Sequence, residues 1–483
     1  MAELEQVPTG GGVTAPAGPC EVRAAPAGSL AVIDRARLRS LLDEEGERFR
    51  RGHPRSAELW ERSQRSLLGG VPMSWMTEWA SPYPVFMAEA RGARLVDVDG
   101  NEYVDLCLGD TGAMTGHSPA GSVSEIARQL ERGLTTMLPT EDAIWVGEEL
   151  SRRFGLARWQ FTTSATDANR FVVRFCRQIT GRPKVLVFDY CYHGTVDETF
   201  ATLDGGIVRA RDGNVGPPVD PALTTKVVQL NDLEGLEAAL APGDVACVLA
   251  EPALTNIGIV LPEPGFHEAL RELTRRIGTL LVIDETHTIS TGPGGYTAAF
   301  GLQPDVLTIG KAIASGIPMG AFGVSEEVAR RIFEQEGADY EDVGGVGGTL
   351  AGNALQLTAA RATLANVLTE DAYARTVPLA ERYTDGVART IEELRVPWHI
   401  VRLSCRAEYM FCPSPPRTGA EAAAAGHDDD LKAYMHLYTL NRGVLITPFH
   451  NMALMSPDTT DGDVDLHTRV FREAVRALLG QQS

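Results

Sequence analysis

A series of short apolar segments most constrains how this chain folds. They lie at residues 185–188, 227–230, 246–250, 280–283, 306–309 and 321–324, and helical patterns such as the one at 266–277 separate several of them. Strands that are apolar on both faces are typical of a parallel sheet that helices cover on both sides. We therefore predict an α/β fold with a mainly parallel sheet, whose ligands bind beyond the carboxyl ends of the strands.

The two ends of the chain are organised differently. Residues 1–30 are rich in Gly, Ala and Pro, and we expect a flexible tail because so few large apolar side chains cannot offset the entropy of ordering. Residues 93–106 alternate around Asp99-Gly100, which predicts a β-hairpin rather than a calcium loop. After residue 350 we expect helices at 356–368 and 378–394, strands at 399–403 and 408–412, and an exposed loop leading into a helix at 419–430.

Charge and cysteine content argue against several classes of protein. The net charge of −20 opposes binding to nucleic acids or anionic membranes. Seven cysteines without a C-x-x-C pair, and ten histidines without an H-E-x-x-H motif, indicate no disulfide framework and no metal site. The most apolar window, 306–324, is too interrupted by Lys311 and glycines to span a membrane. The first basic residue is Arg23, so the charged start of a secretory signal is missing and we expect a cytoplasmic protein.

Lys311 is the strongest candidate for a catalytic residue. The chain has only four lysines, and arginine takes nearly all other basic positions. An amine can lose its proton and form a Schiff base, whereas a guanidinium cannot. Lys184, Lys226 and Lys432 occupy positions typical of solvent-facing side chains, but Lys311 follows a strand and lies among small and apolar residues. The alternative is a lysine whose ammonium group reaches solvent from the edge of the core.

Asp284 follows the strand at 280–283 in the same manner. A buried carboxylate needs a cation, and the protonated pyridine nitrogen of pyridoxal phosphate is one. Lys311 and Asp284 could therefore hold the two ends of one planar cofactor. An Asp that caps the turn after its strand explains the residue equally well.

Three further segments supply groups that such a cofactor needs. Small and hydroxyl residues at 162–169 precede the helix expected at 170–179, where free N–H groups attract an anion, although a helix cap without a ligand is common. The glycine-rich turn 344–349 ends in Thr349, whose hydroxyl could reach a phosphate. Tyr192 offers an aromatic plane for stacking, and His193 beside it is either part of the site or a structural histidine.

Together these segments resemble the class III pyridoxal-phosphate aminotransferases of fold type I, a family that includes amine and ω-amino acid transaminases and glutamate-semialdehyde aminomutases. The resemblance extends from about residue 67 to residue 479. The motifs that carry it are Ser164-Ala165-Thr166-Asp167-Ala168-Asn169, Tyr192-His193-Gly194, Glu251-Pro252, Asp284-Glu285-Thr286, Gly310-Lys311-Ala312-Ile313, and the segments 316–321 and 348–353.

The resemblance implies an architecture as well as a set of roles. A large domain at 106–350 would contain a mainly parallel seven-stranded sheet flanked by helices. A small α+β domain would be built from residues 31–105 and 351–483, after a tail at 1–30. Thr349 would reach the phosphate bound by the neighbouring subunit, so that the active site implies a homodimer or a higher homo-oligomer.

Roles at the site follow position by position. Lys311 would form the internal aldimine with pyridoxal 5′-phosphate and shuttle a proton, and Asp284 would pair with the pyridine nitrogen. Tyr192 and Thr286 would pack on the two ring faces, while Glu251 would orient the hydrogen-bond network. The remaining cofactor residues are Ser164, Ala165, Thr166 and His193. The mild departures from the family pattern are Ala165 for Gly, Asp167 for Glu, and Thr286 for Val or Ile.

The predicted substrate pocket lacks the arginines that clamp a carboxylate in amino-acid-specific relatives. Residues 69–79 and 446–450 contain none, and instead offer Trp75, Trp79, Phe449 and His450. These side chains favour an amine with a bulky hydrophobic substituent, unless they are ordinary core residues. His450 and Arg442 are candidates for holding the carboxylate of the acceptor.

The resulting hypothesis is an aminotransferase with a ping-pong mechanism. A primary amine with a non-α amino group would donate it, and an oxo-acid such as pyruvate would accept it. The alternatives are an aminomutase of the glutamate-1-semialdehyde type and a β-amino acid aminotransferase, which use the same residues. A cofactor-free regulatory relative is the non-enzyme alternative, and the presence of Lys311, Asp284 and the phosphate motif together argues against it.

Overall fold

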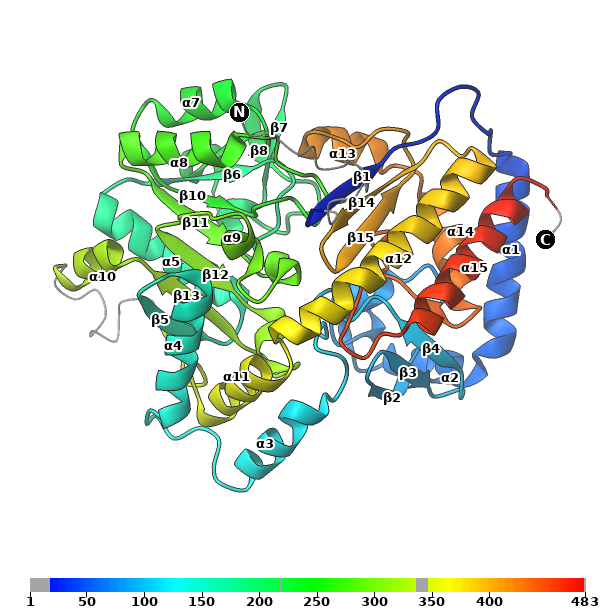
Figure 1. The fold of residues 1–483 in the computed structure, drawn as a ribbon, viewed down its shortest axis with the longest axis horizontal. Coiled ribbons are helices and arrows are strands. Elements are labelled where there is room, and N and C mark those ends of the chain that lie inside the picture. The colour runs from blue at the N-terminus through cyan, green and yellow to red at the C-terminus, as the bar shows by residue number, and fades with distance from the viewer. Residues whose placement is uncertain (1–17, 218, 336–345, 482–483) are drawn as a thin grey trace, which may run out of the picture.

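The computed structural model describes residues 18–217, 219–335 and 346–481. The described chain forms two groups of elements that lie side by side (Figure 1). One is built around a seven-stranded sheet, and the other around two four-stranded sheets. Among the described helices, none combines the length and apolar character that crossing a membrane requires.

The central sheet has the strand order β5-β13-β12-β11-β10-β6-β9. The strands are β5 (Arg158–Thr162), β6 (Lys184–Phe188), β9 (Thr225–Val228), β10 (Val245–Ala250), β11 (Leu280–Asp284), β12 (Val306–Ile309) and β13 (Gly320–Val324). All neighbours are parallel except the pairs that β13 makes with β12 and β5. The six predicted strands and the seven-stranded sheet are confirmed. The edge strand β5 was missed because only its alternate side chains are shielded.

Helices cover both faces of this sheet (Figure 1). The helices of this group are α3 (Ala120–Leu130), which packs on α11 and not on the sheet, α4 (Glu141–Phe154), α5 (Ala165–Thr180), α6 (Pro221–Thr224), α7 (Leu233–Leu240), α8 (Phe266–Ile277), α9 (Gly295–Ala299), α10 (Glu326–Phe333) and α11 (Ala354–Asn366). Helix α5 packs on β10, β12 and β13, while α8 packs on β11 and α7. A hairpin of β7 (Ala201–Asp204) and β8 (Ile207–Ala210) lies beside β9.

The second group of elements combines residues from both ends of the chain. One sheet has the order β1-β14-β15-β17 and the other β16-β4-β3-β2. The strands are β1 (Cys20–Arg23), β2 (Met87–Arg91), β3 (Arg94–Asp97), β4 (Glu102–Asp105), β14 (His399–Leu403), β15 (Arg406–Met410), β16 (Val444–Leu445) and β17 (Met452–Leu454). The helices are α1 (Arg35–Gly52), α2 (Pro54–Ser63), α12 (Glu370–Leu394), α13 (Gly419–Ala425), α14 (Asp429–Leu440) and α15 (Asp461–Leu478). Strands β3 and β4 form the predicted hairpin, and the Asp97 carboxylate accepts hydrogen bonds from its turn.

Three predictions about local structure are wrong. Residues 419–425 form helix α13 instead of a loop, since Thr418 caps the helix and its alanines favour it. Helix α12 begins at Glu370, before Pro378, because Thr369 caps it and packing against α15 and β14 outweighs the hydrogen bond that the proline removes.

The third correction concerns the expected tail at 1–30, of which residues 1–17 lie outside the described part. Residues Cys20–Arg23 form β1, which pairs antiparallel with β14. Glu21 on this strand lies 3.3 Å from the fully buried guanidinium of Arg402. The strand therefore supplies a charge partner that the composition of the segment does not reveal.

Candidate functional site

A cavity of about 480 Å³ opens at the carboxyl ends of the central strands. It lies where a parallel sheet is expected to bind its ligand. Of the residues predicted for the site, those that line it are Trp75, Ser164, Ala165, Thr166, Tyr192, His193, Asp284, Thr286 and Lys311. Segments that are separated by more than 200 residues along the chain therefore meet in one cavity.

Lys311 begins the short 3₁₀ helix η5 (Lys311–Ala314), directly after β12, with a φ of +51°. Its Nζ donates to the backbone oxygen of Asp110 at 2.9 Å and lies 2.8 Å from Asp110 Oδ2 and from His287 Nε2. Burial would raise the pKa of Asp110, but the charge of Lys311 offsets it and lowers the pKa below its usual range. The amine is thus held by three contacts at the wall of the cavity.

Asp284 ends β11 and is almost fully buried. Its Oδ2 accepts hydrogen bonds of 2.9 Å from Asn169 Nδ2 and from His193 Nδ1, and its Oδ1 accepts one from the backbone of Thr286. Burial is the largest single effect and opposes ionisation, but the hydrogen bond and charge of His193, with the hydrogen bonds from Thr286 and Asn169, together outweigh it and lower the pKa of Asp284 to about 2. Asp284 therefore remains an anion at neutral pH.

The first turn of α5 forms the opposite end of the cavity. Ser164 is its N-cap and accepts from the backbone of Asp167, so the N–H groups of Ala165 and Thr166 belong to the unpaired first turn. The loop at 192–194 approaches this turn closely, and the backbone N–H of Thr195 donates to Thr166 Oγ1. Backbone N–H groups and the helix dipole make this end of the cavity suited to an anion.

Tyr192 and Trp75 form an aromatic wall, with ring centroids 5.4 Å apart. Glu251 does not line the cavity. It lies behind Tyr192, where its Oε1 accepts from the Tyr192 backbone and its Oε2 from Thr255. Glu251 thus fixes the aromatic wall and makes no described contact with Asp284.

Four other predicted residues also lie outside this cavity. Trp79 packs against a separate cluster around Phe49 and Tyr103. Phe449 and His450 line a neighbouring cavity, although the Phe449 ring lies 5.6 Å from that of Trp75. Thr349 is exposed and does not line the cavity of its own chain, and residues 344–345 of its turn lie outside the described part.

Arg442 is not available to a ligand. Its guanidinium pairs with Glu45 at 2.8 Å and covers the ring of Tyr438. The suggestion that it holds the carboxylate of an acceptor is therefore wrong. His450 is buried with its Nδ1 3.4 Å from Glu408.

Sequence reasoning missed three residues that contact the predicted ones and a fourth that contacts one of these three. Asn169 bridges Asp284 and the backbone of His193, Asp110 and His287 contact Lys311, and Arg406 contacts His287. Asn169 had a signal, since a polar side chain stands there among the apolar residues of a helix. His287 had a weaker one, its position three residues after Asp284.

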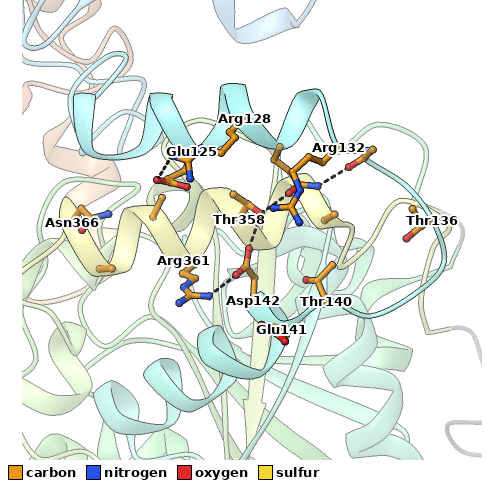
Figure 2. A pocket seen from close by; sticks show the side chains of 15 residues that line it. Glu125, Arg128, Arg132, Thr136, Thr140, Glu141, Asp142, Thr358, Arg361 and Asn366 are labelled. Atoms are coloured by element: carbon orange, nitrogen blue, oxygen red, sulfur yellow. Dashed lines mark hydrogen bonds and ion pairs between the residues drawn. The ribbon is translucent and has the colours of Figure 1, made fainter.

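Two larger cavities do not contain this constellation. One, of about 850 Å³, lies between α3, α4 and α11 (Figure 2). Its charged side chains largely neutralise one another, as Arg361 pairs with Asp142 and Arg128 with Glu125. The other, of about 750 Å³, contains Phe449 and Glu408. The first has no lysine among its lining residues, and the second, although Lys432, Glu408 and the start of α14 at Asp429 line it, contains neither Lys311 nor Asp284 nor the first turn of α5.

The residues of the 480 Å³ cavity fit pyridoxal phosphate. Two of its polar atoms, His193 Nε2 and Thr286 Oγ1, are buried without a hydrogen-bond partner among the described residues. A buried polar atom is costly unless it finds a partner, which a polar ligand would supply. Lys311, the anion at Asp284 and the first turn of α5 match an aldehyde, a pyridinium nitrogen and a phosphate respectively.

Comparisons with known proteins agree with this geometry. The family model described as aminotransferase class-III matches residues 75–402. Among curated proteins, the glutamate-1-semialdehyde 2,1-aminomutase 2 of Halalkalibacterium halodurans is 33% identical over 402 residues, which cover 82% of this chain and 91% of that protein.

Solved structures are similar over most of the chain. A glutamate-1-semialdehyde-aminomutase from Pseudomonas aeruginosa PAO1 is 52% identical, with a TM-score of 0.90, covering 92% of this chain and 99% of the other. A variant of that protein was solved in complex with PMP. An omega-transaminase from Sphaerobacter thermophilus is 28% identical, with a TM-score of 0.79 and coverage of 88% and 97%.

Proposed function

Because the chain belongs to the class-III aminotransferase family, we propose that it is a transaminase that moves the amino group of a primary amine to an oxo-acid such as pyruvate. The cofactor of this family is pyridoxal 5′-phosphate, and the fit of the cavity supports the same cofactor here. The single observation that carries the proposal is the meeting of Lys311, Asp284 and the first turn of α5 in one cavity.

The residues of the cavity divide the chemistry among them. When bound, the cofactor supplies an electron sink that stabilises negative charge at the substrate carbon. Asp284, ionised at neutral pH, holds a proton on the pyridine nitrogen. Nζ of Lys311 is the nucleophile and the carrier of the substrate proton. The N–H groups of Ala165 and Thr166 bind the phosphate, and Tyr192 orients the ring.

The lining of the cavity supports an apolar donor. No arginine lines it in the described part of the chain, and Lys311 is its one basic aliphatic side chain there. The buried Arg406 directs its N–H groups at Thr111, Ser290 and His287. Trp75 and Tyr192, with Phe449 behind them, offer aromatic surface to a bulky substituent. A donor with a second carboxylate would find no bidentate partner there.

The experiment that tests this function follows the visible absorbance of the lysine-bound cofactor. A hydrophobic primary amine, added without any acceptor, should bleach that band and release a stoichiometric ketone or aldehyde. Pyruvate should then restore the band and yield alanine. An unchanged band across a panel of such amines would overturn the proposal.

A second candidate function is favoured by the names of two relatives. Both the P. aeruginosa protein that is 52% identical and the H. halodurans protein that is 33% identical carry the name of an aminomutase. An aminomutase of that type uses the same residues but keeps its intermediate for a second half-reaction. Turnover of an amino-aldehyde to its isomer, without release of a carbonyl product, would favour this alternative.

The role of Lys311 has a direct chemical test. Borohydride reduction of the cofactor-loaded protein followed by peptide mapping should find the cofactor on Lys311. The Lys184→Ala variant should give the same adduct, because Lys184 faces Asp244 at the far end of a strand. An adduct on another lysine, or none, would remove the basis of the proposal.

We also propose that the active unit is a homodimer in which Thr349 serves the site of the neighbouring subunit. Thr349 and Leu350 are exposed and do not line the cavity of their own chain. Five residues after Thr349, the backbone N–H of Ala354 donates a hydrogen bond to the backbone oxygen of Leu134. The connection after α3 exposes Leu134, Met137 and Leu138. Exposed apolar side chains that gather in one region are typical of an interface.

A further inference from the structure

The contacts of Lys311 Nζ suggest which protonation state the site favours. Two of the three neighbours, the backbone oxygen and Oδ2 of Asp110, accept hydrogen bonds. The third is His287 Nε2, at 2.8 Å, which is a donor or an acceptor according to its tautomer. A free amine has two N–H groups and one lone pair, so it satisfies all three neighbours if His287 donates.

The far side of the His287 ring decides its tautomer. Its Nδ1 lies 3.1 Å from Thr111 Oγ1 and 3.4 Å from Arg406 Nη1. Arg406 is fully buried and can only donate, and its Nη2 already donates to Thr111 Oγ1. The Thr111 hydroxyl hydrogen is therefore free to point at His287 Nδ1. These two donors lie within hydrogen-bond distance of Nδ1, whereas the Asp110 Oδ1 acceptor is farther away, at 3.8 Å. Nδ1 therefore accepts, and the ring hydrogen lies on Nε2, toward Lys311.

The backbone holds this arrangement under strain. Asp110 and Thr111 have φ values of +50° and +81°, in the left-handed region that a β-branched residue such as threonine rarely adopts. Strained residues of this kind persist where the surrounding structure fixes them, and they cluster at functional sites. The strain presents the Asp110 carboxylate and the Thr111 hydroxyl to opposite ends of the Lys311–His287 pair.

We propose that Arg406, Thr111 and His287 form a directed hydrogen-bond chain that favours Lys311 as a free amine. That form attacks a carbonyl and accepts a proton from the substrate carbon, whereas an ammonium would face the Nε2–H of His287 donor to donor. His287 touches the reacting nitrogen, while Thr111 and Arg406 are positioning residues that act through it.

The charged groups around Lys311 and His287 have opposite effects on the protonation of Lys311. Asp110 favours the ammonium form of Lys311, and the buried cation at Arg406 opposes it. The charge of Asp284 also acts on His287, while Glu408 from β15 acts on Arg406 and His450 from the loop after β16 acts on Asp110. Burial is the largest cause that holds the pKa of His287 well below its ordinary value, and the buried cation at Arg406 acts in the same direction, so that the ring stays neutral at pH 7.

The importance of this chain for catalysis rests on the proposed function, but the protonation of Lys311 can be measured without it. The full chain, prepared without cofactor, is labelled with a trace of acetic anhydride from pH 6 to pH 11. Peptide mapping then gives the pH of half-maximal labelling for Lys311, with Lys184 in the same molecules as an internal reference.

Three variants make the test specific. Thr111→Val removes the hydroxyl, keeps the side-chain shape, and should raise the Lys311 midpoint by about one pH unit, a tenfold loss of labelling at a fixed lower pH. Thr111→Ser keeps the hydroxyl and should restore the midpoint of the unmodified chain. Asp110→Asn should lower it, because the anion that favours the ammonium form is gone. The Lys184 midpoint should not move.

Two results would overturn the proposed hydrogen-bond chain. One is an unchanged Lys311 midpoint in Thr111→Val, and the other is a downward shift. His287→Phe gives a second reading, since it should raise the midpoint at least as far as Thr111→Val does. If borohydride places no cofactor on Lys311 while these midpoints move as expected, the proposed function fails and the hydrogen-bond chain stands.

Discussion

Gly194 shows how the site depends on a single small residue. The loop 192–194 brings Tyr192 to the cavity and crosses the first turn of α5, where the Gly194 φ is +77°. A Cβ at this position would lie 2.1 Å from Thr166 Oγ1 and 3.0 Å from Thr166 Cα. No real Cβ tolerates such distances, so only glycine allows the stacking residue and the phosphate-binding turn to approach each other.

We therefore expect Gly194→Ala to impair cofactor binding more than folding. The added methyl group should push Tyr192 away from the turn of α5 and weaken the retention of pyridoxal phosphate at least about tenfold, a loss of about 1.4 kcal/mol of binding. Equilibrium dialysis against the free cofactor measures this. The matched control is Gly265→Ala, which has a similar φ of +87° but no atom within 4 Å of the added Cβ. Equal cofactor affinity in the two variants would contradict this account.

At the scale of elements, the packing of α12 against α15 buries a histidine. His467 lies between Tyr383 and Phe471, with its Nε2 3.4 Å from the Tyr383 hydroxyl. Its Nδ1 has no partner among the described residues. Burial lowers the pKa of His467 to about 3, from an ordinary value of 6.5. The folded chain therefore keeps this ring neutral where the unfolded chain protonates it.

The low pKa of His467 in the folded chain makes the protein less stable as the pH decreases. Between pH 6.5 and pH 3 the unfolded state binds the extra proton, so the free energy of unfolding falls as the pH decreases, by about 1.4 kcal/mol per unit for this residue. His467→Phe should remove about 2 kcal/mol of the loss between pH 7 and pH 5. Thermal unfolding midpoints of the variant should decline less across this range than those of the unmodified chain. His427→Gln, which alters an exposed histidine, should leave the decline as it is. Parallel declines in all three proteins would refute the assignment.

At the scale of the whole molecule, the proposed homodimer would complete the site with Thr349 of a second copy of the chain. The connection between α3 and α4 projects from the body of the molecule (Figure 1). It exposes Met137 and Leu138 at 78% and 70%. Apolar side chains so exposed on a single chain are typical of an interface, and they support the proposed dimer.

We expect Met137→Asp combined with Leu138→Asp to yield a monomer of 52.0 kDa and to weaken cofactor binding, because a charge in an apolar interface carries a desolvation cost. Light scattering after size-exclusion chromatography measures the mass, and dialysis measures the bound cofactor. Val32→Asp, at an exposed apolar residue elsewhere, should remain a dimer. A double variant that stays dimeric would place the interface on another surface.

Comparison of the predicted and observed sites shows where sequence reasoning stopped. Lys311 and Asp284 were recognised because each directly follows an apolar strand, and the carboxyl ends of parallel strands meet by geometry alone. Trp79 was misplaced, since an aromatic residue near a predicted pocket looks the same in sequence whether it lines the pocket or packs in the core. Thr111 and Arg406 carried no local signal, because their function depends on contacts across 295 residues.

The sequence by itself determined the parallel sheet, the end of it that binds a ligand, and the amine and carboxylate that stand there, since each of these follows from residues adjacent in the chain. Tertiary structure alone decided what surrounds the amine. The carboxylate at 110, the imidazole at 287 and the guanidinium at 406 come from three distant segments. Their effect on a proton falls off within a few ångströms, so it exists only once the fold has brought them together.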